Sequence, residues 1–176
     1  FGKGKKIEAL RHVFRPSLSY NINPSFDQFY NSYVDPTANE QVVEYSRFEQ
    51  SLYGAPGNVR SSSIGMSISN TIEAKVRDRD TTQVKPKKMI LLNNLNFNTA
   101  YNIAGDSLNW NPLIFSGSIP IVKKLDFNFN GALDPYALNN NNIRVDEFNI
   151  NNGGSLFRLT RANISINYTF SSKDFQ

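Results

Sequence analysis

Cysteine is absent from the 176-residue sequence, and histidine and tryptophan occur once each. Without cysteine the chain can form no disulfide and perform no thiol chemistry. The single histidine, His12, excludes a metal site built from several histidines. The sequence also contains no glycine-rich phosphate loop and no nucleophile–base spacing beyond chance. We therefore expect no enzyme activity, no metal and no bound cofactor.

Long hydrophobic runs are also missing. No apolar stretch approaches the roughly 20 residues that a transmembrane helix needs, which argues against a helical membrane protein. No secretory signal is visible, and the sequence does not begin with methionine. We therefore expect this sequence to be an internal piece of a longer chain.

The excess of positive charge is small. The formal net charge is +4, and much of it lies in short lysine clusters at 3–6, 85–88 and 123–124. Nucleic-acid-binding proteins present a broader basic face, so we expect no nucleic-acid partner. The clusters are typical of charged turns at a boundary with water or lipid headgroups.

Strict alternation of apolar and polar residues is the strongest pattern in the sequence. Phe14, Pro16, Leu18 and Tyr20 alternate with polar residues over 15–23. Successive side chains of a strand point to opposite faces, so each such segment has one apolar and one polar face. No sustained helical period is present, and the sequence predicts an all-β, antiparallel fold of consecutive hairpins. The six strands are expected at about 9–23, 61–77, 89–104, 112–121, 125–136 and 159–171.

Two architectures give this alternation: a soluble β-sandwich with one wet face per sheet, and a transmembrane β-barrel. Several segments reach roughly 12–17 residues, whereas globular strands usually have about 5–6. Large connections follow the first, third and fifth segments, and a tight turn follows the fourth, as in barrels with long outer loops and short periplasmic turns. The link after the second segment is of intermediate length and departs from this pattern. Aromatic residues near segment ends suit membrane interfaces, and we expect Phe14, Tyr20, Tyr101 and Tyr168 at such ends.

The barrel is the architecture that we favour. About eight strands form the smallest transmembrane barrel, so six strands must be one arc of a larger wall. We expect residues 1–176 to be part of one outer-membrane β-barrel domain. Long extracellular loops are expected at about 24–58 and 137–156, with Asn139–Asn142 at a loop tip.

Several stretches, spread in one order over most of the chain, resemble the LptD (OstA) family of lipopolysaccharide-assembly proteins, most closely its Bacteroidota branch. Leu10-Arg11-His12 followed by Pro16-Ser17-Leu18-Ser19-Tyr20 is the most specific of them. The others are 48–54, 68–77, 99–108 and 131–136.

The resemblance implies a location in the bacterial outer membrane. It implies a wall segment of a translocon that inserts lipopolysaccharide into the outer leaflet. The partners implied are lipopolysaccharide, an LptE-like plug lipoprotein, the periplasmic Lpt bridge proteins and outer-membrane lipid. Two alternatives stay open: another outer-membrane barrel such as a nutrient receptor or porin-like channel, or a soluble glycan-binding β-sandwich.

The polar faces supply the candidate site residues. Cations on the inner face could contact phosphates of a passing glycolipid, or pair with one another and with water. Asparagine ladders would give a neutral, hydrogen-bonding lining. The residues expected to face the lumen and contact substrate or plug are Arg15, Lys75, Arg77, Asn96, Asn98, Asn128 and Arg161.

Three residues of the first segment carry local predictions. Arg11 and His12 lie at its inner end, where they make either an anionic or polar contact or a rim hydrogen bond at a turn. Pro16 lies within the strand and has no N–H, which predicts a bulge or a locally open edge.

Overall fold

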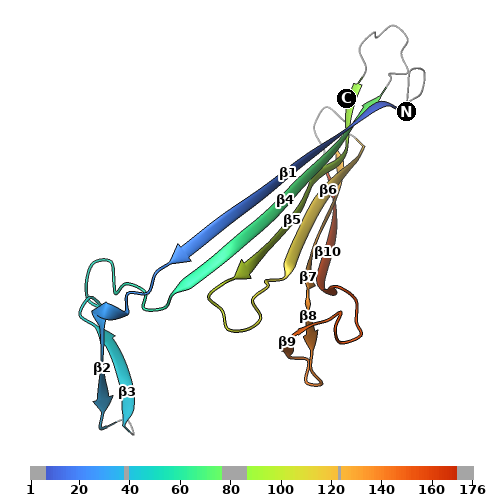
Figure 1. Cartoon of the computed structure of the whole chain (residues 1–176). Helices are drawn as coiled ribbons and strands as arrows, with labels where there is room; N and C mark the ends of the chain where they lie inside the picture. Colours follow the sequence, from blue (N-terminus) through green and yellow to red (C-terminus); the bar gives the residue numbers. More distant parts are fainter. Residues whose placement is uncertain (1–6, 38–39, 77–86, 123, 170–176) are drawn as a thin grey trace.

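The computed structural model describes residues 7–37, 40–76, 87–122 and 124–169, and they form an all-β, antiparallel fold. Six strands make one sheet in the order β1-β4-β5-β6-β7-β10 (Figure 1). Each strand therefore pairs with the next long strand in the chain, as predicted. The bounds are β1 Ile7–Asn23, β4 Ser61–Val76, β5 Lys87–Asn102, β6 Leu113–Val122, β7 Leu125–Asp134 and β10 Arg158–Tyr168.

The two long predicted loops each contain a small hairpin. Between β1 and β4 lie a 3₁₀ helix, η1 (Asp27–Phe29), and the hairpin of β2 (Tyr30–Asp35) with β3 (Gln41–Ser46). Between β7 and β10 lies the hairpin of β8 (Tyr136–Leu138) with β9 (Arg144–Phe148). The asparagine run forms the tip of the second hairpin, as expected. Both hairpins and the 103–112 connection leave from the same end of the sheet, called here the loop end (Figure 1).

The opposite end of the sheet, the turn end, holds the beginning of β1 and the end of β10. The connection from β6 to β7 at this end is a tight turn in which Lys124 has φ +76°. The link from β4 to β5 lies outside the described residues. The two connections that contain hairpins leave from the loop end, but the link over 77–86 is as long as the 103–112 connection, so the predicted alternation of connection size holds only in part.

One face of the sheet is apolar across its full width. Residues that pair directly on neighbouring antiparallel strands project from the same face, so the register identifies each face. One cross-strand row joins all six strands without a polar side chain. In strand order it consists of Pro16, Ile68, Phe97, Phe115, Gly131 and Ala162.

Aromatic rings on this face lie over glycines of the next strand. Phe115 pairs with Gly131, and Phe129 pairs with Gly117. A Cβ on either glycine would lie 2.5 Å from the Cζ atom of the opposite phenylalanine. The absence of a side chain therefore lets each ring lie flat on the strand beside it.

The apolar face has no second layer over it among the described residues. Leu18 on β1 is 73% exposed and Ile164 on β10 is 68% exposed. No large side chain is fully buried within the described ranges, so the sheet has no conventional hydrophobic core. Apolar patches of this extent mark a contact with another protein or with lipid.

Both outer strands of the sheet lack a second partner within the described residues, since β1 pairs with β4 alone and β10 with β7 alone. The register of β1 with β4 runs unbroken through Pro16, so no bulge forms there. The shift in this pair lies instead between Ile7 and Ala9. A proline keeps a regular register where its missing N–H faces away from the partner strand, as on an edge strand. Of the two alternatives predicted for Pro16, the bulge was wrong, whereas β1 is an edge strand among the described residues.

The aromatic residues at the strand ends follow the prediction only in part. Tyr20 and Tyr101 lie toward the loop end, and Tyr168 ends β10 at the turn end. Phe14 instead lies in the interior of β1, opposite Asn70, and was wrongly placed at an end. The alternation pattern gave its face but not its depth along the strand.

The β2–β3 hairpin stands away from the main sheet (Figure 1). Aromatic contacts at its base join Phe29 to Phe26, at 6.2 Å between ring centroids, and to Phe48, at 5.4 Å. The Ser46 hydroxyl donates a hydrogen bond to the carbonyl oxygen of Phe29 at 3.0 Å. These contacts order a segment whose two strands would be only marginally stable alone. No helix among the described residues is long and apolar enough to cross a membrane.

Candidate functional site

The polar face carries a continuous row of hydrogen-bonding side chains that crosses all six strands. It lies one residue along from the apolar row and projects from the opposite face. The Nδ2 atom of Asn163 donates to Oδ1 of Asn130 at 3.1 Å within this row. In strand order, the row consists of Arg15, Ser69, Asn96, Ser116, Asn130 and Asn163. Two of the predicted residues, Arg15 and Asn96, are thereby brought onto one line.

The next row toward the loop end is less uniform. Asn98 pairs with Ser67 on one side and with Ile114 on the other. Arg161 pairs with Ala132, which in turn pairs with Ile114. Asn98 and Arg161 therefore share the polar face, as predicted, with two apolar residues between them. The alternation within β6 alone did not indicate this apolar interruption.

Asn128 also lies on the polar face, between Ser118 of β6 and Ser165 of β10. These three uncharged side chains continue the hydrogen-bonding lining toward the turn end. On β1 and β4 the same face carries small residues. A Cβ on Gly65 would lie 2.6 Å from Oγ of Ser19, so the two strands approach closely here, beside an open hollow of about 220 Å³.

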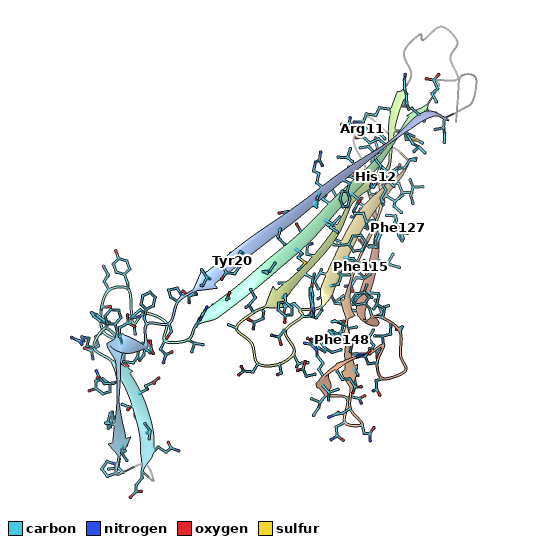
Figure 2. All side chains as sticks on the ribbon, in the orientation of Figure 1. Arg11, His12, Tyr20, Phe115, Phe127 and Phe148 are labelled. Carbon is cyan, nitrogen blue, oxygen red and sulfur yellow. The ribbon has the colours of Figure 1, made fainter. Side chains whose placement is uncertain are left out.

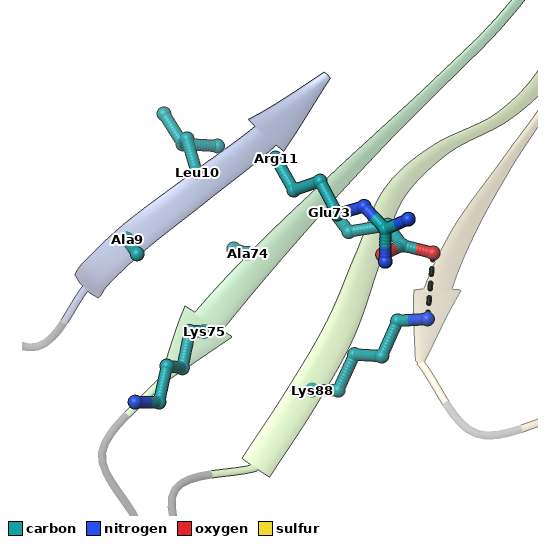
Figure 3. Close-up of a pocket in the computed structure, with 7 residues that line it drawn as sticks. All are labelled: Ala9, Leu10, Arg11, Glu73, Ala74, Lys75 and Lys88. Carbon is teal, nitrogen blue, oxygen red and sulfur yellow. Dashed lines mark ion pairs between the residues drawn. The ribbon is translucent and has the colours of Figure 1, made fainter. Parts of the chain in front are cut away.

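Charged residues gather on the polar face at the turn end (Figure 3). The Glu73 carboxylate forms two ion pairs. Its Oε1 lies 2.7 Å from Nζ of Lys88, and its Oε2 lies 3.8 Å from Nη1 of Arg11. Nζ of Lys75 lies 3.7 Å from Oε2 of Glu8. Arg11, Glu73, Lys75 and Lys88 line an open cavity of about 370 Å³, and Glu8 lies beside it through its pair with Lys75. Three cations and two carboxylates leave one net positive charge here.

Lys75, a predicted lumen contact, is thus part of this ion-pair network. Its side chain is half exposed, so the Glu8 pair leaves it accessible to an anion. Arg77, the other predicted cation of β4, lies outside the described residues. Among the described residues, no group of histidine, aspartate and glutamate side chains is placed to hold a metal ion.

Arg11 and His12 diverge onto opposite faces of β1. Arg11 joins Glu73 on the polar face, whereas His12 lies on the apolar face, where its Nε2 is 3.0 Å from Oδ1 of Asn70. Asn70 Nδ2 donates to the carbonyl oxygen of Leu95 at 3.3 Å. The register of β4 with β5 shifts just beyond this point, and Asn94 has φ +51°. His12 therefore bonds across strands at a bulge, not at a turn.

The best-buried charged group among the described residues lies at the loop end, at the end of β7. The Asp134 side chain is 5% exposed, and its Oδ2 lies 3.0 Å from Nε of Arg144 and 3.2 Å from Nη2 of Arg158. The Arg144 guanidinium also lies over the ring of Tyr136, 5.2 Å from its centroid. Asp134 thereby ties the end of β7 to β9 and to the start of β10. We call Asp134, Arg144 and Arg158 the loop-end ion cluster.

This cluster has a weak sequence signal. Asp134-Pro135 follows an alternating segment and indicates a strand end, but both arginines belong to segments of weak periodicity. One stretch that carried the family resemblance, 131–136, ends beside it and contacts the segment that follows another, 99–108. The backbone N–H of Trp110, just after 99–108, donates to the Tyr136 hydroxyl at 3.0 Å, and Tyr136 ends 131–136.

A family model described as LptD protein matches residues 1–136. The chain belongs to the LptD protein family. The family handles lipopolysaccharide and is associated with the outer membrane. The matched range includes β1 to β7 and ends at Tyr136, within the structure around the loop-end ion cluster. Comparison with curated proteins and with solved structures gives no match.

Membership of the LptD family confirms the family resemblance found in the sequence, and the Bacteroidota branch stays a prediction. The match covers most of the polar face, including Arg15, Lys75, Asn96, Asn98 and Asn128. Arg161, with the rest of β10, follows the matched range. The contacts of these side chains with substrate or plug stay predictions.

Proposed function

We propose that this chain forms part of the wall of an outer-membrane translocon that inserts lipopolysaccharide into the outer leaflet. One observation carries the proposal: an apolar row and a polar row, one residue apart, each cross all six strands. A sheet between lipid and a wet lumen needs this two-faced pattern on every strand. Lipopolysaccharide is proposed as the transported molecule because the chain belongs to the LptD family.

In this proposal the apolar face contacts membrane lipid. The face is exposed, and no second sheet packs on it in the described part of the chain. A soluble sandwich would need such a sheet to bury Leu18, Phe14 and Ile164. The strands have 10 to 17 residues, enough for the 9–11 that a tilted strand needs to cross the hydrocarbon layer.

Further strands would pair with β1 and β10 to close the barrel. Unpaired backbone groups at a sheet edge are costly in lipid, where no water can bond them. The loop end would face the cell exterior, since outer-membrane barrels place their long connections outside. On that basis β1, β5 and β7 run outward, and β4, β6 and β10 run inward.

The polar face would line the transport route or contact the plug. Uncharged amides and hydroxyls offer hydrogen bonds to sugars without trapping an ion. Arg15, Lys75 and Arg161 would contact phosphate groups or anionic side chains. An LptE-like plug lipoprotein and the periplasmic Lpt bridge proteins are the partners proposed, the first in the lumen and the second below the turn end. The work is transport without bond chemistry, so no cofactor takes part.

Paired photocrosslinking in the full-length protein tests the proposal. A photoreactive amino acid replaces Asn98 in one variant and Phe97 in the other. These neighbours lie on opposite faces of β5, at one depth in the sheet. We expect lipopolysaccharide or plug-lipoprotein adducts at Asn98, and only bulk membrane lipid at Phe97.

Each other outcome has a separate meaning. If Phe97 captures lipid but Asn98 captures neither lipopolysaccharide nor the plug lipoprotein, the chain is still a membrane wall but its transport role is overturned. That outcome would favour a nutrient receptor or porin-like barrel. Lipid at neither position would overturn the membrane wall and favour a soluble glycan-binding sheet.

A further inference from the structure

An apolar cavity of about 300 Å³ lies at the loop end, on the apolar side of the sheet. Its lining is almost free of polar surface, unlike the charged cavity at the turn end. The lining side chains that matter here are Trp110, Leu113, Phe148, Ile150, Leu156 and Phe157. They come from β6, β9 and the connections around them, in the region of Phe148 in Figure 2.

The floor of this cavity belongs to the apolar face. Leu113 lines the cavity and pairs with Leu133, which pairs with Leu159 of β10. Thr99 also lines it and pairs with Met66, the partner of Leu18. The cavity is therefore continuous with the surface that we propose to be in lipid.

The walls are held in place by contacts beside the cavity. The rings of Phe148 and Tyr136 stack at 5.4 Å between centroids, with 11° between their planes. The Trp110 ring meets Tyr101 edge-on at 5.1 Å between centroids, and the backbone N–H of Trp110 donates to the Tyr136 hydroxyl. The Asn149 N–H donates to the carbonyl oxygen of Pro135 at 2.8 Å. With the loop-end ion cluster, these contacts keep the side chains from collapsing into the space.

We propose that this cavity binds one acyl chain of a membrane lipid from the leaflet around the loop end. The proposal rests on the proposed function, because it needs the apolar face to lie in lipid. An apolar cavity of about 150 Å³ is enough to hold a benzene molecule, so this one accommodates a longer stretch of hydrocarbon. A chain that leaves the bilayer along Leu113 enters without crossing a polar surface. The bound lipid lies outside the wall and is distinct from a molecule in transit on the polar face.

Two exposed residues provide a matched pair of crosslinking positions. Leu156 lines the cavity and Ile143 does not, yet each is 60% exposed and each lies in the connection between β7 and β10. A photoreactive amino acid replaces one or the other in the full-length protein, in cells grown with an alkyne-tagged fatty acid. Tagged adducts are quantified, and their masses identify the lipid.

We expect severalfold more tagged lipid at Leu156 than at Ile143. Adding Ile150→Trp should fill the cavity and remove the excess at Leu156, with the Phe97 and Asn98 adducts unchanged. A phospholipid mass and a lipopolysaccharide mass would each support the acyl-chain site and identify its source.

Equal labelling at Leu156 and Ile143 would overturn the inference, because it would show general contact with the bilayer. A protein adduct at Leu156, or no adduct there while Phe97 still captures lipid, would also overturn it and leave the membrane wall intact. Absence of lipid at Phe97 as well would show that the proposed function itself had failed.

Discussion

The ring of Phe115 lies against Gly131, its direct partner on β7, and the residues pair on the apolar face. Gly131 is confined on a second side, because a Cβ there would also lie 2.5 Å from the backbone carbonyl oxygen of Arg161. The pair of Phe129 with Gly117 is looser, since its close atoms belong to the phenylalanine ring alone. Two similar aromatic–glycine pairs therefore differ in what a methyl group would displace.

Gly131→Ala should destabilise the folded wall more than Gly117→Ala. The first change forces backbone to move and should cost about 1–3 kcal/mol, the usual range for overpacking, whereas the Phe129 ring can turn away from the second. The measurement is the temperature at which the full-length protein loses the compact mobility of a folded barrel on an SDS gel.

Gly57→Ala is the matched control for both substitutions. A Cβ on Gly57 would meet a single atom, Nδ2 of Asn23, at 3.8 Å, which is an ordinary contact. Its transition temperature should equal that of the unaltered protein. Equal losses in Gly131→Ala and Gly117→Ala would contradict the role given to the Arg161 carbonyl.

The six-strand sheet could be predicted because a period of two is a local property of the sequence. Each strand shows its own two faces, and tight or long connections between consecutive strands imply a meander. Asn96 and Asn128 could be placed on the polar face for the same reason. Registers are not local: the row that joins Arg15 to Asn163 depends on five pairings, and the bulge near Asn94 shifts two of them, β4 with β5 and β5 with β6.

The loop-end ion cluster could not be predicted for a different reason. Asp134, Arg144 and Arg158 lie in segments with different local patterns, and only the β8–β9 hairpin brings them together. The same holds for His12 and Asn70, two polar residues on an apolar face that satisfy each other across strands. Single-segment periodicity treats such residues as interruptions.

Asp134→Asn should loosen the loop end without unfolding the sheet. The buried carboxylate neutralises two arginines, and its loss leaves both without their shared partner. Removal of one member of a buried ion pair costs about 3–5 kcal/mol, and the partial exposure of the arginines lowers this to about 2 kcal/mol. Hydrogen exchange should rise over 136–157 and stay unchanged in β4 and β5.

Asp106→Asn provides the comparison for this change, since Asp106 is an exposed carboxylate of the 103–112 connection at the same end of the sheet. It should leave exchange unaltered throughout. Faster exchange across β4 and β5 in Asp134→Asn would show that the cluster stabilises the whole sheet and not the loop end alone.

Glu73→Gln should have only a small effect on stability at the turn end. The Glu73 side chain is 13% exposed, but Lys88 and Arg11 are largely exposed, and such pairs contribute about 0.2–1 kcal/mol. A double-mutant cycle with Lys88→Met, measured at low and high salt, isolates the pair. The coupling energy should shrink as salt rises.

A salt-independent coupling above this range would contradict an exposed ion pair and indicate a buried one. Lys75→Met serves as the control, because Lys75 pairs with Glu8 and makes no ion pair with Glu73. It should show no coupling with Glu73→Gln beyond experimental error.

Neighbouring residues of β7 should differ in their access to water. Because the chain has no cysteine, Phe127→Cys and Asn128→Cys each introduce the single thiol of this stretch. A charged maleimide reacts with the thiolate, which forms in water and not in hydrocarbon. In native membranes, Asn128→Cys should therefore react severalfold faster than Phe127→Cys, and denaturation should make the two rates equal. Phe129→Cys and Asn130→Cys repeat the comparison on the same two faces, and equal reaction rates within both native pairs would contradict a sheet with lipid on one side and water on the other.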